Sequence, residues 1–273
     1  MSLISLQDVT FSYPNGVLAV EGVSMKLSAG ESVAIVGQNG AGKSTTVKMM
    51  NGLLRPTSGE IIVAGVNTRE RTTAQVSREV GYVFQNPDDQ IFNSSVRKEI
   101  EYGLKRMKLD EDEIERRVDD AAELTGMAPF LEENPFDLPL SIRKFVTITS
   151  VIASDCAALI LDEPTAGQDR AGLERLGELI RTLQARGKAV VTITHDMEFV
   201  AANFERIIVM ANRRVVTEGS PSAIFYDREA MAEARLNPPA VAEVAAALGC
   251  PEVGLDVTAL ARVLTERAAL ARA

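Results

Sequence analysis

The chain has 273 residues, of which 46% are hydrophobic, so it can bury one large core or one core with a modest appendage. No stretch reaches the roughly 18 uninterrupted apolar residues of a membrane-spanning helix, so any membrane role must come through a partner. A net charge of −9 argues against non-specific binding to the phosphate backbone of nucleic acids.

The first elements along the chain have the pattern of strands. Residues 3–11 and 20–27 alternate apolar and polar side chains around a Pro14-Asn15-Gly16 turn, which predicts an antiparallel hairpin. The first ten residues carry neither a basic nor an apolar segment of an export signal, so we expect a cytoplasmic chain. Residues 32–36 then predict a short buried strand, and residues 44–53 have helical spacing.

A glycine-rich segment between that strand and that helix matches the phosphate-binding motif G-x-x-x-x-G-K-[ST]. It consists of Gly37, Gln38, Asn39, Gly40, Ala41, Gly42, Lys43 and Ser44. Glycines let backbone N–H groups approach phosphates, and the positive end of the following helix supports the negative charge. We expect Lys43 to reach the β- and γ-phosphates, Ser44 to coordinate Mg²⁺, and Thr45 to belong to the same nucleotide-binding segment. The alternative, a chance glycine-rich turn, is disfavoured by the strand-to-helix context.

A helical region follows at about 93–155 and looks like an inserted helical subdomain. Its charged block, 105–120, is expected to form one solvated helix face. Just after it comes Cys156, one of two cysteines; neither it nor Cys250 has C-x-x-C spacing, and the chain has one histidine. We therefore expect both cysteines to be small apolar packing residues rather than part of a zinc site or a disulfide.

Two apolar strands at 158–161 and 188–193, separated by a helix over 170–186, predict a parallel sheet. The first strand runs into Asp162 and Glu163, which places two carboxylates at the sheet edge where α/β folds bind ligands. Asp162 suits the shell of Mg²⁺, and Glu163 can polarise an attacking water as a general base. Alone, such a pair is more often a solvated turn, but the phosphate-binding segment favours a functional role.

The composition shifts towards Ala, Arg and Glu after Gly219. We expect one α/β domain over residues 1–220 and a short helical extension over residues 221–273. Asp256 is the expected N-cap of a last helix. An apolar stripe on that helix fits intrachain packing and a subunit contact equally well, and consists of Leu260, Val263, Leu264 and Ala268.

Together with Gln85 after the strand at 81–84 and His195 after the strand at 189–193, these motifs resemble the ABC transporter ATPases. The resemblance covers roughly the first 220 residues and implies a P-loop NTPase fold with an antiparallel β subdomain. It also implies ATP and Mg²⁺ as cofactors and ATP hydrolysis coupled to transport. In that family the residue at Gln85 senses Mg²⁺ and water, the residue at His195 contacts the γ-phosphate, and the residue at Tyr13 stacks on adenine. The plain alternatives are a loop glutamine, a structural histidine and a core tyrosine.

A narrower resemblance comes from residues 84–92, Phe-Gln-Asn-Pro-Asp-Asp-Gln-Ile-Phe, and from Asn237-Pro238-Pro239. Both are similar to the ATPase subunits of energy-coupling factor (ECF) and cobalt-type importers, which take up vitamins or transition-metal ions. The resemblance implies a pair of ATPases at the cytoplasmic face of the membrane. It further implies a transmembrane scaffold and a small substrate-binding membrane protein as partners, with no role for nucleic acid.

The expected Leu-Ser-Gly-Gly-Gln signature is degenerate. In the family it completes the ATP site of the neighbouring subunit, and counting 23 residues back from Asp162 places its serine at Pro139. The signature would then read Leu138-Pro139-Leu140-Ser141-Ile142, in which Pro139 has neither hydroxyl nor N–H and side chains replace glycines. A register shifted by two residues recovers Leu-Ser but needs a deletion and puts Ile142 and Arg143 at the glycines.

The degenerate signature predicts a heterodimer whose second ATPase has an intact one. Losing one hydrogen bond to a charged group costs about 1.5–3 kcal/mol, so the site that receives this signature should hydrolyse ATP poorly. A milder departure lies in the loop expected at the dimer face, Gln168-Asp169, where the family usually has Leu before Asp. The competent site is expected to combine the partner's signature with Lys43, Gln85, Asp162, Glu163 and His195.

Three other functions stay open from the sequence: the ATPase of another ABC importer or exporter, a soluble mechanical ABC ATPase, and a nucleotide-binding subunit without turnover. The acidic charge and the lack of tandem cassettes disfavour the second. Intact Glu163 and His195 argue against the third.

Overall fold

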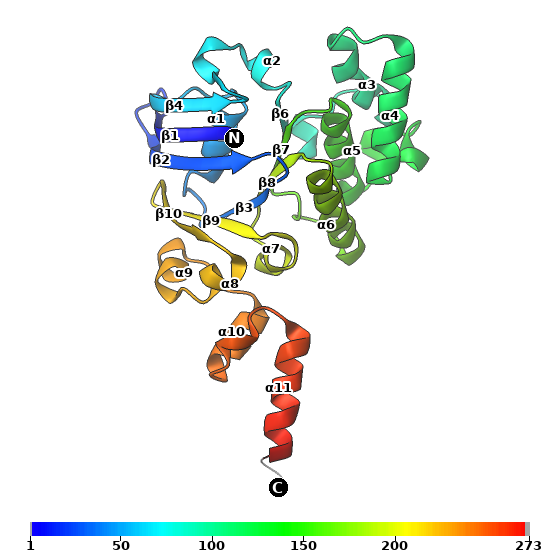
Figure 1. Ribbon diagram of the computed structural model, residues 1–273. Helices are drawn as coiled ribbons and strands as arrows, with labels where there is room; N and C mark the ends of the chain where they lie inside the picture. The colour runs from blue at the N-terminus through cyan, green and yellow to red at the C-terminus, as the bar shows by residue number, and fades with distance from the viewer. Residues whose placement is uncertain (1, 271–273) are drawn as a thin grey trace.

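The computed structural model describes residues 2–270, and the side chains of these except at 252 and 268–270. Two β-sheets lie against each other at the centre of the chain (Figure 1). The smaller sheet is antiparallel and contains, in spatial order, β2 (Leu18–Ser28), β1 (Ser2–Ser12), β4 (Ser58–Val63) and β5 (Val66–Asn67). Leu6 pairs with Met25 across β1 and β2, which confirms the predicted hairpin.

The larger sheet is mixed, and its order is β10-β9-β3-β8-β7-β6. All of its neighbouring strands pair in parallel except β10, which runs antiparallel to β9. The predicted parallel sheet is therefore confirmed, and the carboxyl ends of five strands meet at one edge. The strands are β3 (Ser32–Val36), β6 (Val80–Val83), β7 (Ala158–Asp162), β8 (Ala189–Ile193), β9 (Arg206–Ala211) and β10 (Arg214–Gly219).

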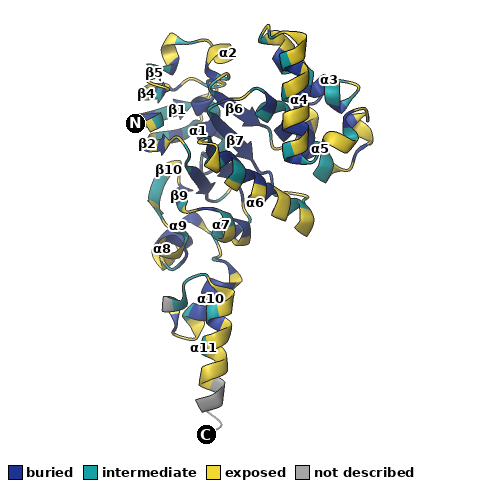
Figure 2. Cartoon of the chain, turned by 45° about the vertical axis from the view of Figure 1, so that its right-hand side comes forward, coloured by how far each residue is buried: buried dark blue, intermediate teal, exposed yellow. Residues whose placement is uncertain are grey.

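Alternate residues of the parallel strands belong to two different hydrophobic cores, because successive side chains of a strand point to opposite faces of the sheet. Val33 and Ile35 of β3 join the antiparallel sheet and α1 (Lys43–Met50) in one core, with the short α2 (Thr73–Val76) at its edge. Ala34 and Val36 join the helices on the other face. Figure 2 shows these strands buried between the two layers.

The helical layer contains α3 (Val96–Arg106), α4 (Glu111–Thr125), α5 (Leu140–Ala153), α6 (Arg170–Ala185) and α7 (Met197–Asn203). The expectation that the charged block 105–120 forms one helix face is wrong, because two helices meet there. Lys108 adopts a left-handed φ of 62°, and the Asp110 side chain accepts a hydrogen bond from the Glu113 N–H and so starts α4.

The C-terminal helices belong to two packing groups. α8 (Pro221–Phe225) and α9 (Arg228–Ala234) contribute to the core beneath the parallel sheet. α10 (Ala240–Ala247) and α11 (Val257–Leu270) share a small cluster of their own and project from the rest of the chain (Figure 1), and Ala242 of α10 also joins the main core. Both cysteines are free and buried, as expected of packing residues.

The last helix begins as predicted. Asp256 accepts hydrogen bonds from the N–H groups of Thr258 and Ala259, which confirms it as the cap. Leu260 and Val263 pack inside the chain, whereas Leu264 is exposed, and the side chain of Ala268 lies outside the described residues. Within residues 2–270, no helix combines the length and hydrophobicity that a membrane span requires.

Candidate nucleotide-binding and catalytic site

The phosphate-binding segment connects β3 to α1, so its backbone turns sharply at the carboxyl edge of the parallel sheet. Two of its glycines cannot be replaced without displacing the main chain. Gly37 has a φ of 148°, and a Cβ there would overlap the carbonyl of Met210. Gly42 has a φ of 97°, and a Cβ there would lie 2.6 Å from the carbonyl oxygen of Ala19. The close packing therefore requires glycine at both positions.

Lys43 begins α1 and turns its side chain back into this loop. Its ammonium donates to the carbonyl oxygens of Gly37 at 2.6 Å and Gln38 at 3.0 Å. Burial lowers the pKa of Lys43, and the carboxylates of Glu163 and Asp162 partly oppose that shift. The loop thus encloses a positive charge among backbone amides, an arrangement that suits a polyphosphate.

Of the three residues expected at the Mg²⁺ site, Ser44, Gln85 and Asp162, the first and last touch each other, and Gln85 lines the same cavity as Ser44. Ser44 donates its hydroxyl to Oδ1 of Asp162 at 3.3 Å. The other oxygen of Asp162 accepts a hydrogen bond of 2.6 Å from the hydroxyl of Tyr82, a residue of β6 that the sequence did not single out. A hydroxyl and a carboxylate side by side offer the hard oxygen ligands that Mg²⁺ prefers, so the donor set fits this ion.

Glu163 follows directly, in a strained conformation with a φ of 51°. Burial raises its pKa to about 7, against the attraction of Lys43. Its Oε1 lies 3.2 Å from Nε2 of His195, whose side chain is 45% exposed at the end of β8. A carboxyl group with a pKa near neutrality can accept a proton at working pH, as a general base must.

A cavity of about 440 Å³ brings most of the predicted site residues together. Its volume lies within the roughly 300–1,000 Å³ typical of ligand sites. It is lined by Asn39, Gly40, Ala41, Gly42, Lys43, Ser44, Thr45, Gln85, Glu163, Ala166 and His195.

Tyr13 lies beside this cavity rather than in its lining. Its hydroxyl is 3.1 Å from Oγ1 of Thr45, and its ring stands edge-on to Phe11 with the centroids 4.9 Å apart. The side chain is partly exposed, so a ring face stays accessible next to the first turn of α1. This position is compatible with stacking on a base.

The predicted signature residues lie away from the cavity, at the start of α5. Pro139 takes the N-cap position and offers no side-chain acceptor to the first turn. Leu140 is 48% exposed and packs against Gly167. The carbonyl of Ser141 accepts a hydrogen bond of 3.1 Å from the side-chain amide of Gln168.

The loop predicted at the dimer face therefore contacts the signature within one chain. Asp169, next in that loop, caps α6 by accepting from the N–H of Gly172 at 2.7 Å. Ile142 is half-buried and packs against the helical core.

Lys144, in the second turn of α5, is a site residue that sequence reasoning missed. Its side chain is buried, and its ammonium donates to the main-chain carbonyl of Glu163 at 2.6 Å. Burial lowers the pKa of this lysine. A lysine directly before Phe145 and Val146 was the available signal, but its partner, 19 residues away, is set only by packing. Arg143 similarly binds Asp88 at 2.6 Å, linking α5 to the segment that follows Gln85.

Comparison with known proteins places this geometry in a family. The family model described as ABC transporter matches residues 20–166. The energy-coupling factor transporter ATP-binding protein EcfA of Methanocaldococcus jannaschii is 35% identical over 246 residues, which cover 89% of this chain and 88% of that protein. The protein of the same name from Methanothermobacter thermautotrophicus is 36% identical over 244 residues, with 89% and 78% covered.

Solved structures agree with these relatives. CbiO1 from Clostridium perfringens, described as part of the ABC transporter complex CbiONQ, superimposes with a TM-score of 0.77 and 32% identity over 89% of this chain and 98% of its own. A dimeric ATP-binding cassette in a post-hydrolysis state with ADP and Pi superimposes with a TM-score of 0.73 and 26% identity, covering 80% of this chain and 98% of that one.

Proposed function

Because the chain belongs to the ABC transporter family and is an ATPase, we propose that it powers an energy-coupling factor importer for a vitamin or a transition-metal ion. The similarity to EcfA and CbiO1 supports this class of transporter. In this proposal the chain sits at the cytoplasmic face of the membrane, beneath a transmembrane scaffold and a small substrate-binding membrane protein. Identifying the proteins that co-purify with this chain in mild detergent tests the proposal, because another ABC importer or exporter would have different membrane subunits.

The proposal that this chain hydrolyses ATP rests on the position of Glu163. Its carboxyl group opens into the cavity formed by the phosphate-binding segment, and its pKa of about 7 lets it accept a proton near neutral pH. We assign it the role of holding and polarising the water that attacks the γ-phosphate. His195, in contact with Glu163, would hold the γ-phosphate in line with that water.

The remaining residues bind and orient the substrate. Lys43 and the loop amides would bind the β- and γ-phosphates, and Tyr13 would stack on the adenine ring. Ser44 and Asp162 would hold Mg²⁺, with Gln85 facing the same cavity. When bound, this ion neutralises charge on the β- and γ-phosphate oxygens.

We further propose that this chain works in a heterodimer with one degenerate site. Pro139 has no hydroxyl to offer a γ-phosphate, and the exposed Leu140 stands where the family has glycine. A homodimer would carry this defect at both sites. In a heterodimer, an intact signature from the partner would complete the site built on Lys43 and Glu163.

The heterodimer is tested by turnover of the reconstituted pair. Glu163→Gln in this chain should abolish most ATP hydrolysis while nucleotide binding persists, and the equivalent change in the partner should cost little. Equal losses from the two changes would contradict the asymmetry. A variant that restores the signature is the matched control. Pro139→Ser, Leu140→Gly and Ser141→Gly together should raise hydrolysis at the second ATP site, which pairs this signature with the partner's phosphate-binding loop.

A further inference from the structure

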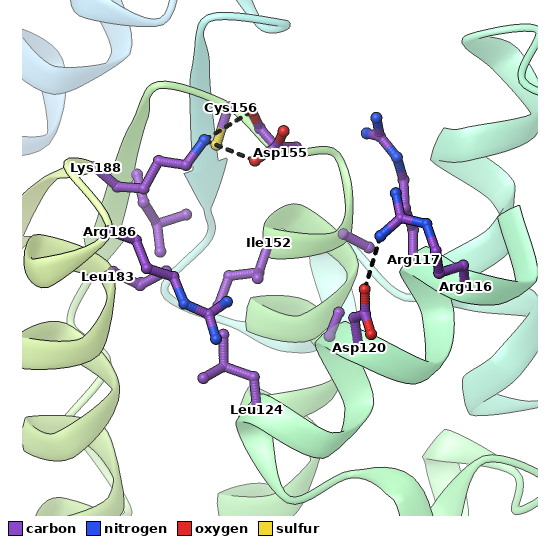
Figure 3. Close-up of a pocket in the computed structure, with 13 residues that line it drawn as sticks. Arg116, Arg117, Asp120, Leu124, Ile152, Asp155, Cys156, Leu183, Arg186 and Lys188 are labelled. Carbon is purple, nitrogen blue, oxygen red and sulfur yellow. Dashed lines mark hydrogen bonds and ion pairs between the residues drawn. The ribbon is translucent and has the colours of Figure 1, made fainter. Parts of the chain in front are cut away.

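A second cavity, of about 200 Å³, lies between the helical subdomain and the parallel sheet (Figure 3). It shares no lining residue with the nucleotide cavity. α4 and the end of α5 form one side, and the end of α6 with the start of β8 forms the other. Its inner wall is apolar and is built from Ala121, Leu124, Ile152, Leu159 and Leu183.

The rim of this cavity carries more positive than negative side chains. Arg116, Arg117, Arg186 and Lys188 line it together with Asp120 and Asp155. Three of these cations already have acidic partners: Lys188 binds Asp155 at 2.7 Å, Arg116 binds Asp120 at 2.9 Å, and Arg117 binds Glu113 at 2.6 Å. Even with Glu113 counted, four cations face three carboxylates. One positive charge therefore stays uncompensated, in a chain whose net charge is −9.

The uncompensated charge is that of Arg186. Among the side chains that the structure describes, none forms an ion pair or hydrogen bond with its guanidinium. Arg186 is exposed at the mouth of the cavity, and Figure 3 shows its side chain extending from the end of α6 toward Ile152 and Leu124, which line the same cavity. An unpaired arginine at the rim of an apolar cavity presents a planar set of donors that matches a carboxylate.

We propose that this cavity binds a small organic anion, a carboxylate with a short apolar body. The carboxylate would pair with Arg186, and the apolar body would fill the space beside Leu124 and Leu183. The volume is below the roughly 300–1,000 Å³ of sites for drug-sized ligands, so a nucleotide is too large for it. Metal cations are excluded by the surplus of positive charge on the rim.

A ligand in this cavity would affect how the helical subdomain moves relative to the sheet layer. It would touch α4 of the helical subdomain and α6 of the sheet layer at once. A ligand bridging two elements stabilises the arrangement in which both contacts are made. Binding should therefore oppose movement of α4 relative to α6.

Hexanoate is a suitable probe, because it joins one carboxylate to a short alkyl chain. Its binding to the full-length chain would be titrated by saturation-transfer NMR at constant ionic strength, beside hexanamide and acetate. We expect saturable binding of hexanoate, and binding at least tenfold weaker for the amide, which lacks the charge, and for acetate, which lacks the apolar body. Equal binding of hexanoate and hexanamide, or no saturable binding of hexanoate, would overturn the proposal.

Variants locate the site. Arg186→Gln should weaken hexanoate binding at least tenfold, whereas Arg170→Gln, which removes an exposed arginine from the same helix, should leave it unchanged. Ala121→Leu fills the cavity without touching any charge and should also abolish binding. Lys43→Ala reports on the other anion site: a loss of hexanoate binding in this variant, with retention in Arg186→Gln, would place the anion in the phosphate-binding loop and refute the assignment.

Discussion

Lys144→Met tests whether the start of α5 supports Glu163, the proposed catalytic carboxylate. Methionine keeps the length and approximate volume of the side chain but removes the charge and the donor that binds the Glu163 carbonyl at 2.6 Å. Leaving a buried acceptor unpaired costs about 1–3 kcal/mol. Lys144 is only 5% exposed, so removing its partly desolvated charge offsets some of that cost. We expect the free energy of unfolding to fall by about 1–2 kcal/mol.

The effect on catalysis should be larger than the effect on stability. Glu163 is held at a φ of 51°, and backbone strain of this kind costs about 1–3 kcal/mol. This cost is comparable to the free energy of the hydrogen bond from Lys144 that keeps the backbone in this conformation. Without Lys144 the backbone can relax, which displaces the carboxylate. Since a misplacement of about 1 Å can cost a factor of about 100, we expect kcat for ATP to fall between about tenfold and a hundredfold. The KM should change little, because the phosphate-binding loop is untouched.

Urea unfolding of the chain and steady-state hydrolysis in the assembled transporter measure the two effects. Lys144→Arg restores a cationic donor and should recover part of kcat. Lys105→Met, on an exposed lysine of the helical subdomain, is the matched control and should change neither quantity. Wild-type kcat in Lys144→Met, or a drop in kcat that Lys144→Arg leaves uncorrected, would refute the reasoning.

Three further changes probe the site. Gly37→Ala puts a Cβ against the Met210 carbonyl, so calorimetry should detect no ATP binding, and wild-type affinity would contradict the close packing described. Tyr82→Phe removes the donor that orients Asp162, so half-maximal hydrolysis should require about tenfold more Mg²⁺; an unchanged Mg²⁺ titration would exclude that role. In the nucleotide-free chain the pKa of Glu163 is raised from 4.5 to about 7, so its contribution to stability is complete below pH 4.5 and is lost as pH rises to 7. Glu163→Gln should therefore gain up to about 3 kcal/mol over wild type between pH 4.5 and pH 7.5, measured by urea unfolding; parallel pH profiles would show that the carboxyl titrates normally.

Local rules of chain geometry explain which parts of the fold could be predicted. The hairpin, the strand Ser32–Val36 and the phosphate-binding segment each depend on neighbouring residues, through alternation or through glycines at fixed spacing. The break between two helices in the charged block 105–120 also has a local signal, because Asp110 is a typical N-cap residue. The continuous run of charged residues on both sides hid that signal. The packing of α8 and α9 into the main core was not visible in composition alone.

Contacts between distant segments explain what the sequence could not reveal at the site. Tyr82 and Asp162 are 80 residues apart and meet because β6 and β7 are neighbours in the sheet. Lys144 meets Glu163 because α5 packs across the end of β7. The pairing of Gln168 with Ser141 depends on the same packing.

The first two turns of α5 have an evolutionary consequence. Their residues contact both ends of the loop that carries the proposed catalytic carboxylate. Lys144 binds Glu163 at one end, and Leu140 and Ser141 contact Gly167 and Gln168 at the other. A substitution in this stretch would thus be selected for its effect inside its own subunit, whatever it does for the neighbouring one. Natural variation here should consequently stay restricted even in lineages where the partner's ATP has stopped being turned over.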